Sequence, residues 1–293
     1  MTLPITLFIL AAVTHRPPFI KLLADRWVDA ETMLCVGLDP DPERLPAHLP
    51  RGRDGLVPFC TAIMDATADL VCAFKPQFAH FAALAAEAEL AAVIDHAHRH
   101  HPDVPVILDA KRGDIGDTAR RYAVEAFERY DADAVTVNAF LGPESVEPFL
   151  AYSGRGVVVL CRTSNPDSDW LQCHPTEAPL FLRIATAATS WNRAGNVMLV
   201  AGATQAEDLR RIRQTVGDMP LLVPGIGAQG GDLAAVIDAG LDSAGLGLVI
   251  NASRAVLYAG GGPGFADSAR QAAMALRDDI RRLRAARRTA AAS

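Results

Sequence analysis

The sequence predicts an α/β protein, a single (β/α)8 TIM barrel, and three observations lead to this fold class. Short apolar segments recur eight times along the 293 residues and alternate with alanine-rich amphipathic segments. Each apolar segment is almost continuously apolar, as a strand that is buried on both faces must be. No Pro-, Gly- or Ser-rich linker divides the units, so the strict alternation favours parallel strands closed into one barrel.

The elements follow in a regular order after an N-terminal extension. Residues 1–17 hold an apolar stretch that lacks the basic start of a signal peptide and is too short to span a bilayer. We expect this extension to lie outside the fold and the catalytic barrel to cover residues 18–293. The expected strands are 33–39, 70–76, 104–111, 133–140, 156–163, 196–202, 220–227 and 243–250. The expected helices include 81–99, 117–130, 178–192, 204–216, 231–239 and 265–288.

Composition limits the partners and the compartment. The formal net charge of −6 argues against nucleic acid or an anionic membrane as a partner of the whole surface. An anionic small molecule would therefore need a local positive pocket. Five scattered cysteines without a C-x-x-C pair indicate a reduced, cytoplasmic setting and no structural zinc site.

Charged and amide side chains stand at the ends of the expected strands. In a (β/α)8 barrel the carboxyl ends of all strands open onto one face, which carries the active site. The residues at or just beyond these ends are Asp39, Lys75, Asp109, Lys111, Asp114, Asn138, Arg162, Thr163, Ser164 and Arg254. The sequence therefore predicts a charged site at the mouth of the barrel.

The stretch LDAKRGD (108–114) carries the most informative charges. On a regular strand Asp109 and Lys111 point the same way, and Lys75 ends the neighbouring strand. Together with Asp114 they predict an array of alternating charge in a partly desolvated pocket. Nearby carboxylates keep a lysine protonated, and a fixed ammonium can protonate or stabilise a developing carbanion. The alternative is a structural ion-pair cluster at a strand end.

Two later loops have the composition of a phosphate site. PGIGAQGGD (224–232) and NASR (251–254) follow the seventh and eighth strands, where barrels commonly bind phosphate. Glycines let backbone N–H groups approach an anion, Arg254 supplies a guanidinium, and Gln229 offers an amide. The same loop contains the pattern G-x-G-x-x-G, which is also found in dinucleotide-binding domains. In those domains the pattern belongs to the first unit and an acidic residue follows about 20 positions later, whereas here it lies in the seventh unit, so dinucleotide binding is disfavoured.

These motifs, in this order, resemble the orotidine 5′-phosphate decarboxylase family in its longer bacterial form. The resemblance covers nearly all of residues 18–285, and its strongest motif is D-x-K-x-x-D-I-x-x-T at residues 109–118. CVGLDPDPERLP (35–46), FKPQFAHF (74–81), CRTSNP (161–166) and PGIGAQGGD also match. The resemblance implies cofactor-free and metal-free decarboxylation of orotidine 5′-phosphate to UMP, the last step of pyrimidine biosynthesis, by a homodimeric barrel.

The resemblance also implies a role for each matched residue. Lys111 would protonate C6 of the pyrimidine, and Asp109 would lie against the substrate carboxylate. Lys75 would complete the charge network and, like Asp39, reach the ribose. Asp114 and Thr118 would contribute to the neighbouring subunit's site.

The remaining matches concern the base, the phosphate and the mouth of the site. Ser164 would contact the base, and Gln229 with Arg254 would grip the phosphate. Pro224 begins the phosphate loop, and Gly230 belongs to it. Residues 165–179 are expected to form a loop over the mouth that helps to exclude water.

Three alternatives remain open from the residues alone. Lys111 could form a Schiff base with a phosphosugar, although flanking carboxylates oppose the lowered pKa that such a lysine needs. Related barrels with D-x-K-x-x-D act on sugar phosphates with a divalent metal, and a silent nucleotide-binding protein is a third possibility. The histidine-rich stretch 96–101 is interpreted as a solvated helix end, because no carboxylate or cysteine completes a metal site at ligand spacing.

Overall fold

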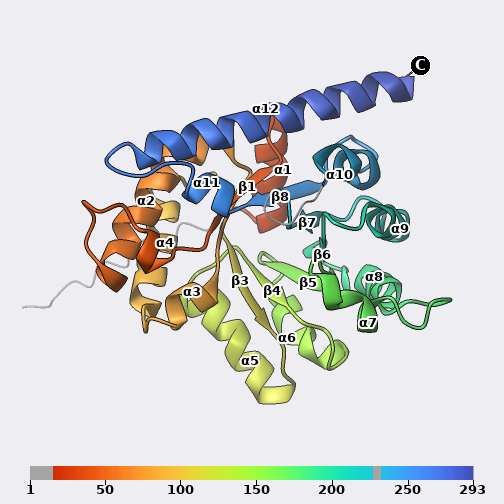
Figure 1. Cartoon of the computed structure of the whole chain (residues 1–293). Helices are drawn as coiled ribbons and strands as arrows, with labels where there is room; N and C mark the ends of the chain where they lie inside the picture. The colour runs from red at the N-terminus through yellow and green to blue at the C-terminus, as the bar shows by residue number, and fades with distance from the viewer. Residues whose placement is uncertain (1–15, 227–231, 293) are drawn as a thin grey trace, which may run out of the picture.

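The computed structural model describes residues 16–226 and 232–292 and arranges them as a ring of strands surrounded by helices (Figure 1). The strands of the described residues are β1 (Leu34–Leu38), β2 (Ala73–Pro76), β3 (Ile107–Arg112), β4 (Ala134–Val137), β5 (Gly156–Arg162), β6 (Val197–Ala201), β7 (Leu221–Val223) and β8 (Leu248–Ala252). Each expected strand overlaps one of them, and the predicted (β/α)8 barrel is confirmed.

Strand pairing closes the ring. The strands pair in parallel in the order β2-β1-β8-β7-β6-β5-β4-β3. Two isolated parallel bridges, Phe74 to Val106 and Gln77 to Asp109, join β2 to β3. Every residue of β1, β2, β4, β6, β7 and β8 is buried, because side chains fill the interior and helices cover the outside.

Helices follow the strands around the outside. They are α1 (Phe19–Asp29), α2 (Leu56–Thr67), α3 (Phe78–Ala82), α4 (Glu87–His100), α5 (Gly116–Val124), α6 (Glu147–Leu150), α7 (Asp169–Gln172), α8 (Leu180–Trp191), α9 (Ala206–Val216), α10 (Leu233–Gly240), α11 (Arg254–Leu257) and α12 (Phe265–Ala292). Short 3-10 turns lie at Pro42–Arg44, Gly52–Gly55, Ala68–Leu70, Pro143–Ser145 and Pro166–Ser168, and a π-helical turn, Glu125–Arg129, continues α5. The helix expected at 81–99 is divided into α3 and α4, with Ala85 at φ 50° between them.

Helix α1, which the periodicity did not single out, covers the amino ends of the strands. Phe19, Leu23 and Trp27 recur at intervals of four and are buried, so they form one apolar face. The Trp27 indole Nε1 donates a hydrogen bond to the carbonyl of Leu248 at 2.8 Å. Phe19 packs so tightly on β5 that a Cβ at Gly156 would lie 2.3 Å from its ring. These contacts close the end of the barrel opposite the site.

The segment before α1 contacts the barrel as well. Arg16, which the sequence assigned to the extension, pairs with the buried carboxylate of Asp133 at 2.9 Å. Residues 1–15 lie outside the described residues. Within the described part of the chain, every helix is too short or too polar to cross a bilayer.

Candidate active site

A cavity of about 460 Å³ opens at the carboxyl ends of the strands, and all eight strands or the loops that follow them contribute to its wall. Its polar lining consists of Asp39, Lys75, Gln77, Asp109, Lys111, Thr136, Thr163, Ser164, Asn165, Asn251, Ser253 and Arg254. The volume suits a ligand the size of a nucleotide. The cavity therefore opens at the end of the barrel where the sequence analysis expected the site.

A carboxylate that bridges two ammonium groups forms the charged centre of this cavity. Lys75 Nζ lies 2.8 Å from Asp109 Oδ2, and Lys111 Nζ lies 2.6 Å from Asp109 Oδ1. The side chains of Lys75 and Asp109 are only 5% and 9% exposed, whereas that of Lys111 is 47% exposed. Of the two lysines, Lys111 is thus the one that a ligand in the cavity can readily reach.

Two neutral side chains that the sequence analysis did not assign complete the partners of Asp109. The Thr136 hydroxyl donates to Asp109 Oδ1 at 2.9 Å and accepts the backbone N–H groups of Ala110 and Lys111. Gln77 Nε2 donates to Asp109 Oδ2 at 3.2 Å. Thr136 is the one polar residue within β4, and a polar residue in a buried strand is the sequence signal that could have identified it. Asp109 is therefore held in one position by four donors.

Electrostatics keep the buried pair charged. Burial alone would raise the pKa of Asp109, but the charges and hydrogen bonds of Lys75 and Lys111 outweigh it and hold that pKa well below its usual range. Burial would likewise lower the pKa of Lys75, yet Asp109 and Asp39 outweigh it and raise that pKa. With Arg254, the lining carries three basic and two acidic groups, a formal charge of +1 in a chain of −6. The cavity is the local positive pocket that an anionic substrate requires.

The backbone of β3 becomes irregular where it carries Lys111. The pairing of β3 with β4 changes register between Leu108 and Arg112, and Lys111 has φ 47°. A regular strand was expected to direct Asp109 and Lys111 to the same side. The two side chains meet as expected, although the strand is bulged and Lys111 adopts the left-handed region. Such a conformation in a residue with a Cβ costs on the order of 1–3 kcal/mol and is concentrated at functional sites.

At the end of β1, the strand next to the one that carries Lys75, Asp39 offers an unused acceptor. Its Oδ1 atom is buried and has no hydrogen-bond partner among the described residues. A buried acceptor without a partner is uncommon in folded proteins, and a ligand hydroxyl would satisfy it. Nearby, Gly37 makes room for the end of β8, because a Cβ there would lie 2.0 Å from the Ser253 hydroxyl.

Arg162, counted above among the strand ends, lies beneath the mouth of the cavity. Its guanidinium is 1% exposed and bonds Asp208 at 2.7 Å, Asp169 at 2.5 Å and Ser168 at 2.5 Å. Ser168 and Asp169 belong to the segment expected to form a loop over the mouth, which contains a 3-10 turn and α7. Arg162 therefore fixes this loop, and it does not line the cavity itself.

The other predicted residues differ in whether they line the cavity. Pro224 and Arg254 line the cavity beside each other at the ends of β7 and β8, and Ser164 lines it from the end of β5. Asp114 and Thr118 do not line it: the Asp114 carboxylate accepts the N–H of Ile115, and Thr118 is exposed.

The remaining predicted positions are Gln229, Gly230 and Asn138. Gln229 and Gly230 lie outside the described residues. Asn138, at the end of β4, turns away from the cavity, and its Oδ1 accepts the N–H of Phe140.

Comparison with known proteins gives one consistent family. The model of the orotidine 5′-phosphate decarboxylase / HUMPS family matches residues 32–266. Orotidine 5′-phosphate decarboxylases of Azoarcus sp. and Dechloromonas aromatica are 58% and 56% identical over 264 residues, covering 89% of this chain and 98% of each relative. The OMP decarboxylase structure of Leishmania donovani superposes with a TM-score of 0.80 at 38% identity, covering 91% of this chain and 99% of that one. This chain therefore belongs to the orotidine 5′-phosphate decarboxylase / HUMPS family.

Proposed function

We propose a mechanism, centred on Lys111, for the decarboxylation of orotidine 5′-phosphate to UMP that this chain catalyses. The observation that carries it is the buried Asp109 carboxylate holding the Lys111 ammonium at 2.6 Å in the wall of a nucleotide-sized cavity. Every step uses the chain's own side chains, in keeping with the cofactor-free reaction that the resemblance implies.

Binding begins at the phosphate. Arg254 and the backbone after Pro224 meet the 5′-phosphate at the rim formed by the ends of β7 and β8. The unpartnered Oδ1 of Asp39 accepts a ribose hydroxyl, and Lys75 supports the same side of the cavity. Ser164 contacts the base. Binding energy gained at the phosphate then orients the ring against Lys111, and this energy lowers the barrier to the chemical step.

The chemical step breaks the bond between C6 and its carboxylate. The bonding electron pair stays on C6 as CO2 leaves, and the adjacent Lys111 ammonium stabilises this developing charge. Lys111 Nζ then donates a proton to C6, which gives UMP and a neutral amine that regains a proton from water. Asp109 positions the ammonium, and the fixed charges require no reorganisation during the reaction.

Loss of the Lys111 amine tests this mechanism. We expect Lys111→Ala to lower kcat by more than about 1000-fold, measured as the change in ultraviolet absorbance when orotidine 5′-phosphate becomes UMP. UMP binding, measured by calorimetry, is expected to persist. Lys21→Ala is the matched control, because Lys21 lies on α1 with a 62% exposed side chain.

Outcomes that contradict the mechanism are equally definite. Turnover by Lys111→Ala near the wild-type rate would remove Lys111 as the proton donor. Inactivation of the wild-type enzyme by a chelator would favour metal-assisted sugar-phosphate chemistry. Tight UMP binding by a wild-type protein that never turns over would indicate a binding protein.

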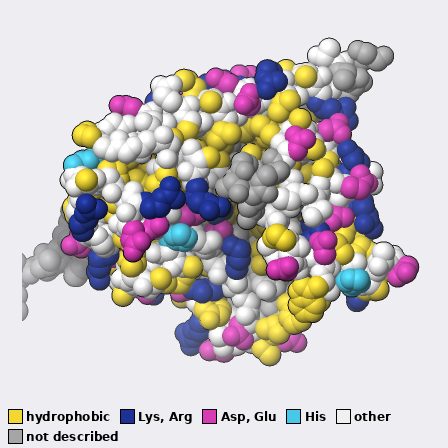
Figure 2. Space-filling view, in the orientation of Figure 1, with side chains coloured by type: hydrophobic (Ala, Val, Ile, Leu, Met, Phe, Trp, Pro, Cys, Tyr) yellow, Lys and Arg dark blue, Asp and Glu magenta, His cyan; other side chains and the backbone are white. Residues whose placement is uncertain are grey.

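We also propose that the enzyme is a homodimer in which Asp114 and Thr118 reach the neighbouring site. Neither residue lines the cavity of its own chain, although both belong to the motif that carries Asp109 and Lys111. Apolar side chains are exposed beside them, with Ile115 49% and Phe140 69% accessible. Figure 2 shows apolar side chains gathered over the region of α6, low on the face in view.

Subunit mixing tests the shared site. Lys111→Ala and Asp114→Ala homodimers are each expected to be inactive. After unfolding and refolding together, half of the dimers are mixed, and each mixed dimer has one site free of both substitutions. About a quarter of the wild-type activity therefore returns. Failure of the mixture to recover activity would contradict the shared site without affecting the role of Lys111.

The reduced, cytoplasmic setting remains part of the proposal. All five cysteines are free, and four of them are buried. Burial raises the pKa of the Cys35 thiol to about 12, so this group behaves as an inert apolar side chain. Fractionation of cells that express the full-length chain tests the compartment, and recovery of the enzyme outside the cytosol would contradict it.

A further inference from the structure

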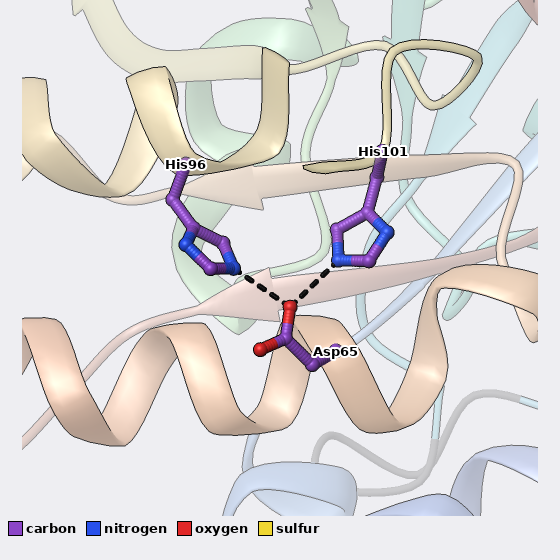
Figure 3. A group of neighbouring side chains, drawn as sticks. All are labelled: Asp65, His96 and His101. Atoms are coloured by element: carbon purple, nitrogen blue, oxygen red, sulfur yellow. Dashed lines mark hydrogen bonds and ion pairs between the residues drawn. The ribbon is translucent and has the colours of Figure 1, made fainter. Parts of the chain in front are cut away.

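Two histidines and an aspartate converge on the outside of the barrel, away from the cavity. Asp65 lies on α2, and His96 and His101 lie at the end of α4 (Figure 3). The Nε2 atoms of both rings point at the same carboxylate oxygen of Asp65, each at 2.7 Å. The expectation of a solvated helix end missed this arrangement, because the carboxylate is supplied by a different helix.

We propose that Asp65, His96 and His101 form a binding site for Zn²⁺ that ties α2 to α4. Their three ligand atoms lie within 4.8 Å of one another. Imidazole nitrogen and carboxylate oxygen are ordinary zinc ligands at about 2.0–2.2 Å, which places ligand atoms about 3.3 Å apart in a tetrahedron. Each nitrogen-to-oxygen distance of 2.7 Å needs to lengthen by about 0.6 Å, and the two nitrogens, which lie within 4.8 Å of each other, need to take the same tetrahedral spacing.

The two rings are held in position for this role. Their side chains are only 19% and 17% exposed. The ring of His96 stacks on that of His100 with centroids 4.4 Å apart, and His101 lies against Phe74 at 6.5 Å. Asp65, by contrast, is 52% exposed. Fixed imidazoles combined with an adjustable carboxylate lower the cost of forming the site, and solvent can supply a fourth ligand.

The atoms that face Asp65 are the Nε2 atoms of both rings. A metal ion would take the place of any proton between these nitrogens and the carboxylate, so both imidazoles must be neutral when the ion binds. Two neutral imidazoles that merely share the carboxylate are the alternative arrangement of the same residues.

The location predicts a structural role for the ion. Asp65 is near the carboxyl end of α2, and His96 and His101 stand at the carboxyl end of α4, a few residues before β3 begins. Helices run back from the mouth of a (β/α)8 barrel, so this is the face opposite the active site. A metal here links residues more than 30 positions apart, stabilises the folded state and leaves turnover unchanged.

Metal titration of the full-length protein tests the inference. After treatment with a chelator and dialysis, the wild-type protein is expected to bind one Zn²⁺ by calorimetry, with a melting temperature that rises as ZnCl2 is added. Asp65→Asn, His96→Gln and His101→Gln are each expected to weaken binding at least tenfold. His48→Gln is the matched control, because His48 is an exposed histidine outside the group.

A spectroscopic measurement keeps the inference testable if a variant folds poorly. Co²⁺ added to the wild-type protein is expected to give the visible d–d bands of a low-coordinate site, and excess Zn²⁺ is expected to abolish them. Absence of saturable binding to the wild-type protein would overturn the site. An equal response of the wild-type and His96→Gln proteins would overturn it too, because the metal would then bind elsewhere. The orotidine 5′-phosphate assay is independent of both outcomes.

Discussion

Truncation of Asp109 to Ala is expected to leave the Lys75 ammonium without its partner inside the barrel. The Lys75 side chain is 5% exposed, and its Nζ lies 2.8 Å from Asp109. Removal of one member of a buried ion pair costs about 3–5 kcal/mol, because the other charge remains desolvated. At about 2–4 °C per kcal/mol for a chain of this size, the melting temperature falls by about 6–20 °C.

A second substitution separates this penalty from any general damage to the fold. Lys75→Met removes the unpaired ammonium and fills the space of the lysine side chain with an apolar side chain of similar length. Added to Asp109→Ala, it is expected to restore most of the lost melting temperature, while activity stays absent. The pair would then be retained for catalysis and not for stability.

Differential scanning calorimetry of four proteins measures the effect: the wild type, each single variant and the double variant. The double variant is expected to be more stable than Asp109→Ala alone, so the effects of the two substitutions on stability do not add. If Asp109→Ala melts within about 2 °C of the wild type, the unpaired buried charge costs far less than about 3–5 kcal/mol. If Lys75→Met adds a further loss in the Asp109→Ala background, the account of the pair is wrong.

Three further predictions test the surroundings of the site. Arg162→Lys keeps the positive charge but loses the paired guanidinium contacts to Ser168 and Asp169 in the segment expected to cover the mouth. Steady-state kinetics are expected to show a larger rise in KM than fall in kcat. Burial would lower the pKa of His98, but hydrogen bonds to two aspartates outweigh it and raise that pKa. Protonated His98 therefore stabilises the fold at pH values below the unfolded pKa of about 6.5, and this contribution is lost as the pH rises through the raised pKa of the folded protein. The urea midpoints of the wild type and His98→Gln are expected to differ at about pH 5.5 and to converge by about pH 9. Gly202→Ala places a Cβ 2.7 Å from the Ser164 backbone nitrogen and is expected to lower kcat/KM, whereas Gly154→Ala, with no atom within 4 Å, leaves it unchanged.

The sequence predicted where the cavity opens because the carboxyl ends of the strands are neighbours in a barrel. Lys75, Asp109 and Arg254 are far apart in the chain, and each was first singled out by its place at or just after the end of an apolar run. Closure of the ring brings such positions to one mouth whatever the details of side-chain packing. The same rule explains why Thr136 was not predicted, because it lies inside an apolar run and not after it. Asn138 was singled out instead, because it follows the end of β4.

Contacts between neighbouring helices could not be derived in this way. The meeting of Asp65 with His96 and His101 depends on how α2 and α4 are rotated about their own axes, which periodicity fixes only to within a broad apolar face. The left-handed conformation of Lys111 was equally hidden, because no glycine or asparagine marks it in the sequence. The proposed shared site would be a property of two chains, and a single chain leaves Asp114 and Thr118 outside its own cavity.

The left-handed conformation at position 111 means that chemistry and folding make opposing demands on one residue. Glycine would hold this backbone with about 1 kcal/mol less strain, and asparagine tolerates it better than most residues. Under the proposed mechanism, the need for an amine at this place offsets the strain. In distant barrels of this lineage, glycine or asparagine at the equivalent position would then mark a protein that does not donate a proton from this place.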